Sequence, residues 1–98
     1  MEFDWNPDGI LRMRVDEVLH YIWDPLGISD FPEARDEYYS YSAVAFVMLK
    51  NGASASEIEG YLTKTRIEHI GVGRGPEAES EADIADLLVR WKQVILEE

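Results

Sequence analysis

WDPLGISDFPEARDEYYSY, residues 23–41, separates two helical patterns and holds the densest mixture of acidic and aromatic residues in the chain. Asp24-Pro25 must end the first pattern, because proline pushes the residue before it out of helical geometry. Gly27 suits a left-handed turn position. Phe31-Pro32 is typical of a helix start, with proline near the first turn. We therefore expect a turn here, followed by a helix that opens with carboxylates.

Apolar residues recur at helical spacing through the rest of the chain and predict four helices. Gly52 is a C-terminal stop for the second helix. Ser54-Ala55-Ser56-Glu57 fits a capping box before the third, and residues 80–83 repeat that signature before the fourth. The expected ranges are about Ile10–Trp23, Pro32–Asn51, Ala55 to Glu68 or His69, and Glu79–Leu96. Short connections between them predict an all-α fold, a compact bundle in one domain over residues 1–98.

The N-terminal residues Asn6-Pro7-Asp8-Gly9 leave two conformations open. Asn6 could cap a helix that has Pro7 at its first position, where the missing amide hydrogen costs nothing. Alternatively, the four residues form the turn of a hairpin that joins residues 2–5 to residues 10–13. We favour the helix start.

Two patterns resemble metal sites, and neither is complete. Asp4-x-Asn6-x-Asp8-Gly9 matches the first half of a calcium-binding EF-hand loop, but Val15 stands where a glutamate should bind the ion. Glu17 and His20 have the E-x-x-H spacing of di-iron helical bundles, but no second such pair follows. We therefore expect no metal or other cofactor, and we expect His20 on the surface beside an acid.

Charge is the strongest signal in the composition, at −11 over 98 residues. Such a field repels nucleic acid and anionic membrane and attracts basic surfaces, although acidity can also serve solubility alone. Seven acids and one base lie between Val15 and Leu49, and five acids and no base between Gly75 and Val89. No apolar run approaches the roughly 18 residues of a membrane span. We expect a cytoplasmic protein with a basic protein partner.

Catalytic motifs are missing from the sequence. There is no cysteine, no G-x-S-x-G and no pair of histidines at ligand spacing. Asp24 and Asp36, beside the turn, are the best candidates for a carboxylate site, but Asp24 is more simply a turn or capping residue. We therefore expect a protein that is not an enzyme.

Three segments resemble a known group of proteins: the turn Trp23-Asp24-Pro25-Leu26-Gly27-Ile28, the run Ala34-Arg35-Asp36-Glu37-Tyr38 and the pattern Glu57-Ile58-x-x-Tyr61-Leu62. Together they resemble small acidic bacterial proteins, some of them similar to immunity proteins of contact-dependent growth inhibition and other polymorphic toxin systems. This resemblance implies a basic toxin domain, such as a nuclease, as the partner. It implies no catalytic residues.

Exposed tyrosine beside carboxylates is typical of a protein-recognition surface, because tyrosine offers a large contact area at low entropic cost. The acidic start of the last helix, Glu77–Asp86, is the alternative surface. The alternative function is a regulatory or housekeeping adaptor without a toxin partner. An obligate homodimer is one form that such an adaptor could take. The residues that we expect to contact the partner are Asp30, Glu33, Asp36, Glu37 and Tyr39.

Overall fold

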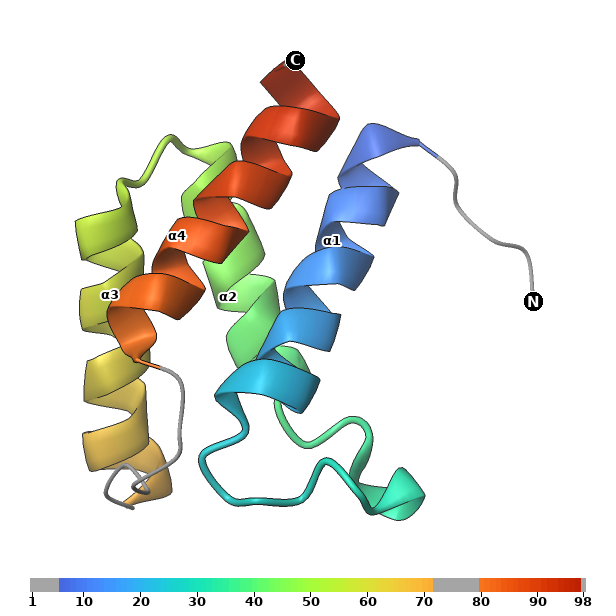
Figure 1. The fold of residues 1–98 in the computed structure, drawn as a ribbon, viewed down its shortest axis with the longest axis vertical. Helices are drawn as coiled ribbons and strands as arrows, with labels where there is room; N and C mark the ends of the chain where they lie inside the picture. The colour runs from blue at the N-terminus through green and yellow to red at the C-terminus, as the bar shows by residue number, and fades with distance from the viewer. Residues whose placement is uncertain (1–5, 72–79, 98) are drawn as a thin grey trace.

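The computed structural model describes residues 6–71 and 80–97, and within them the chain forms four α-helices and no strand. Figure 1 shows the helices as a bundle in which α4 lies between α1 and α3, which confirms the all-α fold. A π-helical turn continues α1, α3 and α4 at their C-terminal ends. The bounds are α1 Pro7–Val18 with Leu19–Trp23, α2 Tyr39–Lys50, α3 Ala55–Lys64 with Thr65–Ile70, and α4 Glu81–Lys92 with Gln93–Glu97.

The first helix begins as favoured from the sequence. The Asn6 side chain accepts a hydrogen bond from the Gly9 amide at 2.7 Å, and Pro7 is the first helical residue. The alternative hairpin is wrong, because residues 10–13 lie inside α1; residues 1–5, including Asp4 of the calcium pattern, lie outside the described residues. Asp8 of that pattern forms an ion pair with Lys50 at 2.7 Å.

The second helix begins later than predicted. Proline starts only a single 3₁₀ turn, Pro32–Ala34, and α2 starts at Tyr39. No side chain in the described part of the chain caps either start. The buried side chain of Tyr38 instead donates a hydrogen bond to Asp24 at 2.8 Å, which ties this segment back to the end of α1 before a regular helix can form. The expected helix start at Pro32 is therefore wrong, and Asp36 and Glu37, which were expected to belong to the opening of that helix, precede α2.

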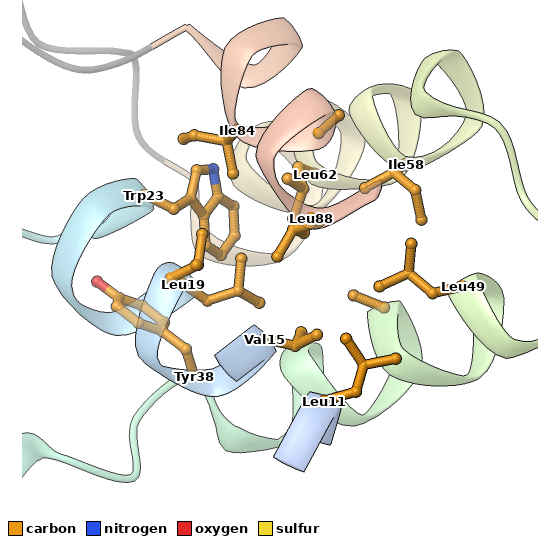
Figure 2. Packing of buried hydrophobic residues seen from close by; sticks show 13 residues of the cluster. Leu11, Val15, Leu19, Trp23, Tyr38, Leu49, Ile58, Leu62, Ile84 and Leu88 are labelled. Carbon is orange, nitrogen blue, oxygen red and sulfur yellow. The ribbon is translucent and has the colours of Figure 1, made fainter. Parts of the chain in front are cut away.

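The hydrophobic core draws on all four helices. Figure 2 shows side chains converging from them, with Trp23 and Tyr38 at one end of the cluster and the Tyr38 hydroxyl pointing away from it. Full burial of one valine, leucine or isoleucine side chain stabilises the folded state by about 1.5–3 kcal/mol. The fully buried leucine, isoleucine and valine side chains are Leu11, Val15, Leu19, Leu49, Ile58, Leu62, Ile84 and Leu88.

The predicted capping box of α3 is confirmed. The Ser54 hydroxyl accepts from the Glu57 amide at 3.2 Å, and the Glu57 carboxylate accepts from the Ser54 amide at 2.8 Å. At α4 the Ser80 hydroxyl likewise accepts from the Asp83 amide at 3.0 Å. These bonds satisfy amide groups that have no partner within the helix.

Ser54→Ala is expected to lower the free energy of unfolding by about 1 kcal/mol, because the Glu57 amide loses its acceptor. Ser56→Ala, an exposed position in the same first turn, is the matched control and should change stability by less than about 0.5 kcal/mol. Urea denaturation of both variants measures the difference. Equal stability of the two would contradict a capping role for Ser54.

Candidate partner-binding surface

Residues 24–38, here named the acidic loop, join α1 to α2 (Figure 1). The carboxylate of Asp24 connects the two ends of this loop by hydrogen bonds. Asp24 has a left-handed backbone with φ 32°, which asparagine and aspartate tolerate better than most residues. Its side chain accepts hydrogen bonds from the amides of Ile28 at 2.9 Å and Ser29 at 3.0 Å. The Tyr38 hydroxyl donates to the same carboxylate and accepts from the Leu26 amide at 2.9 Å. Asp24 therefore ties both ends of the loop together.

The protonation states of Asp24 and Tyr38 suit this arrangement. Burial raises the pKa of Asp24, but hydrogen bonds from Ile28, Tyr38 and Ser29 outweigh it and leave the pKa below its ordinary value. Burial, together with the neighbouring Asp24 carboxylate, raises the pKa of Tyr38. At neutral pH an ionised carboxylate thus faces a protonated hydroxyl. The interpretation of Asp24 as a turn and capping residue is confirmed.

An ion pair with α1 holds Arg35, the only basic residue of the acidic loop. Arg35 forms an ion pair with Asp16 of α1 at 2.7 Å, and its guanidinium lies 5.3 Å from the centre of the Tyr21 ring. Asp16 also accepts a hydrogen bond at 3.0 Å from the Ser42 hydroxyl of α2. Since Asp16 neutralises Arg35, the outward charge of the loop comes from its acids.

The five residues predicted to contact the partner all lie exposed. Four of them bring carboxylates into the acidic loop, and none of these carboxylates forms an ion pair within the described residues. Tyr39 is the first residue of α2, and its ring centre lies 4.2 Å from the Arg12 guanidinium carbon. The four carboxylates belong to Asp30, Glu33, Asp36 and Glu37.

Glu81, on the alternative acidic surface, faces inward and is only 4% exposed. Its carboxylate accepts hydrogen bonds from Arg66 at 2.7 Å, from the Trp23 indole at 2.9 Å and from the Thr63 hydroxyl at 3.1 Å. This network was not predicted from the sequence. A signal was available, because Glu81 precedes Ile84 and the buried residues of α4 at helical spacing.

The rest of the alternative surface is only partly described. Glu77 and Glu79 lie outside the described residues, and so does the expected helix start at Glu79. Asp83 and Asp86 are exposed on α4. Because Glu81 is buried and paired with Arg66, these two are the acids that the described part of this surface presents to a partner.

The prediction that His20 lies on the surface is wrong, since it is only 1% exposed. It lies in the π-helical turn Leu19–Trp23, where the wider backbone repeat changes which side chains face inward. Its ring meets Tyr21 edge-on at 4.5 Å between centroids, and its Nδ1 has no hydrogen-bond partner among the described residues. Glu17, the other half of the E-x-x-H pattern, pairs with Arg14 at 2.7 Å.

The described residues contain no group of three or more histidine, cysteine or acidic side chains that could hold a metal ion. Nor does any helix in this part of the chain combine the length and apolarity needed to cross a membrane.

Comparison with known protein families, curated proteins and solved structures finds no match. The function must therefore be inferred from the chemistry of the surfaces themselves.

Proposed function

We propose that this chain is a non-enzymatic binding module that neutralises a basic protein, acting in the bacterial cytoplasm as an immunity protein against a nuclease-like toxin domain. The observation that carries the proposal is the acidic loop, in which four exposed carboxylates form no ion pair within the described residues. The loop is tied at Asp24 and at Arg35, so its carboxylates are held in place before a partner arrives.

Charge and preorganisation both favour this kind of partner. A nuclease must present a basic groove to hold phosphates, and an acidic protein that covers this groove excludes the substrate. Opposite charges accelerate the encounter of two proteins by steering them together. A loop that is already ordered loses less conformational entropy on binding than a disordered one. The acidic loop meets both requirements.

A double charge reversal, Asp36→Lys with Glu37→Lys, is expected to slow association with a basic toxin domain by about tenfold or more at low salt, because it reverses two of the four exposed carboxylates of the loop. The assay expresses the candidate toxin domain from the neighbouring upstream reading frame, with and without this protein, and counts surviving cells. Wild type should restore survival, and the double variant should restore it poorly.

The matched control reverses two exposed acids of α4, Asp83→Lys with Asp86→Lys. This variant should protect cells as well as wild type does. The opposite pattern, with protection lost only in the α4 variant, would move the contact surface to α4. Absence of toxicity, or toxicity that wild type does not relieve, would argue against the immunity function.

One observation favours the alternative, an adaptor that works as a homodimer. Val44 and Val47 are exposed on α2, the most apolar of the described α-helices. Sedimentation velocity separates the two functions, because a toxin-neutralising module should be a stable monomer without its partner. A dimer at micromolar concentration would support the adaptor.

A further inference from the structure

An apolar groove of about 520 Å³ lies where the C-terminal end of α1 meets α4. Tyr21 and Ile22 form part of its wall and are 58% and 40% exposed. A smaller hollow of about 170 Å³ shares Leu87 and Trp91 with it and extends along α4 past Arg90 to Val94. The apolar lining of the groove consists of Val18, Tyr21, Ile22, Leu87 and Trp91.

The charged groups in the groove neutralise each other. Arg14 and Glu17 form an ion pair at 2.7 Å, and the Arg14 guanidinium also lies 5.3 Å from the centre of the Trp91 ring. The remaining lining is apolar and includes two aromatic residues, Tyr21 and Trp91. Tyrosine and tryptophan are enriched among the residues that carry most of the binding energy of protein interfaces. The groove thus has the composition of an interface centre.

The groove adjoins the acidic loop through Tyr21. This side chain lines the groove, and its ring also lies 5.3 Å from the guanidinium of Arg35, the arginine of the acidic loop. Arg35 in turn is neutralised by Asp16. The apolar groove and the acidic loop therefore adjoin each other at Tyr21 and Arg35, and together they offer an apolar area beside an acidic segment, as in a protein interface with a polar rim.

We propose that this groove binds an amphipathic helix of the basic partner, with the apolar face of that helix in the groove and its lysines and arginines toward the acidic loop. The proposal rests on the function proposed above and specifies the chemistry of the partner. A groove between two helices accepts the side-chain ridge of a third, and Leu87, Trp91 and Val94 follow α4 at the spacing of such a ridge.

Charge selects this occupant over a second copy of the chain. Each copy carries a charge of −11, and a symmetric dimer through the groove would bring two acidic loops and two such charges together. A basic amphipathic helix meets an apolar centre and an opposite charge at the edge. The pattern of apolar and basic residues on the partner is thus the feature that the surface recognises.

Three synthetic peptides, each roughly four helical turns long, test the proposal on the full chain. The first has leucines along one face and lysines elsewhere, the second has the same composition with the leucines scattered, and the third replaces the lysines by glutamates. Titrations followed by amide NMR shifts should show the first binding about tenfold or more tightly than the others. The shifts should centre on Tyr21, Ile22 and the Trp91 indole.

A pair of matched variants locates the binding. Ile22→Ser should raise the dissociation constant of the lysine peptide by about tenfold. Ile67→Ser should change it by less than about twofold, because Ile67 occupies a π-helical turn too and is 57% exposed but does not line the groove. Both residues are exposed, so neither substitution should unfold the chain, and the far-ultraviolet spectrum checks this.

Several results would overturn the proposal: equal binding of the scattered peptide, equal binding of the glutamate peptide, shifts confined to residues 30–37, or a dimer that Ile22→Ser dissociates. A result that rejects the groove as a binding site can be distinguished from a result that rejects the immunity function. Loss of cell rescue with Asp36→Lys/Glu37→Lys but not with Ile22→Ser would reject the groove and keep the function. Peptide binding in the groove without any rescue would keep the helix site and reject a toxin as the partner.

Discussion

Glu81→Ala is expected to lower the free energy of unfolding by about 3–5 kcal/mol, because Glu81 forms a buried ion pair with Arg66 and removing one partner of such a pair is strongly destabilising. The Glu81 carboxylate is 4% exposed and accepts hydrogen bonds from Arg66 at 2.7 Å and from the Trp23 indole at 2.9 Å. Alanine would leave the indole N–H without this acceptor as well. Urea denaturation followed by tryptophan fluorescence measures the loss.

Asp86→Ala is the matched control, an exposed acid on the same helix, and should change stability by less than about 0.5 kcal/mol. Glu81→Gln should fall between the two, because it keeps an oxygen acceptor but loses the charge that faces Arg66. If Glu81→Ala were no more damaging than Asp86→Ala, the buried network could not be an important contribution to stability.

The hydrogen-bond network around Glu81 should also make the stability of the protein depend on pH in the acidic range. Burial raises the pKa of Glu81, but hydrogen bonds from Arg66, Trp23 and Thr63 outweigh burial and lower the pKa from its ordinary value of 4.5. A group whose pKa is lowered by folding contributes its full stabilisation above the ordinary value and loses it as the pH falls through the folded-state pKa. Wild type should therefore lose stability below about pH 4.5, and Glu81→Ala should lose less over that range.

Helix locations could be predicted where the apolar spacing and a capping residue agree. Asn6, Ser54 and Ser80 cap α1, α3 and α4 with their side chains, and each was predicted from the local sequence. The start of α2 could not be predicted in this way, because no side chain in the described part of the chain caps it. A long-range hydrogen bond between Tyr38 and Asp24 sets that boundary, and local sequence does not encode such a bond.

Two side chains, those of His20 and Glu81, are buried although rules based on local sequence place them on the surface. His20 was placed by a repeat of 3.6 residues, but the π-helical turn at the end of α1 has a different repeat. Glu81 was placed on the surface because acids are rarely buried without a partner. Its partner Arg66 comes from the turn that ends α3, so only the folded chain brings the pair together.

Exposure of the acidic loop was predictable, and the groove beside it was not. Acids without a partner are rarely buried, so Asp30, Glu33, Asp36 and Glu37 are expected on the surface. The groove instead combines Tyr21 and Ile22 of the turn after α1 with Leu87 and Trp91 of α4. Helical spacing predicts which residues share a face, but it does not predict how much of that face the neighbouring helices leave uncovered.

Asp24→Ala is expected to lower the free energy of unfolding by about 2–3 kcal/mol. Alanine removes the acceptor for the amides of Ile28 and Ser29 and for the Tyr38 hydroxyl, and it adapts poorly to the left-handed backbone at this position. Urea denaturation measures the total effect. Hydrogen exchange at the two amides should show a loss of protection that is confined to the acidic loop at low denaturant.

Two further variants separate the causes. Asp24→Gly removes the side chain but relieves the left-handed backbone, so its stability should exceed that of Asp24→Ala by about 1 kcal/mol. Asp24→Asn keeps the oxygen that accepts from Ile28 and Tyr38 and tolerates the backbone, but it removes the negative charge. If Asp24 acts on a basic partner by holding the loop, Asp24→Asn should keep most of the affinity that Asp24→Ala loses. Equal losses in both variants would assign the effect to charge and would leave the position of the loop without a role in binding.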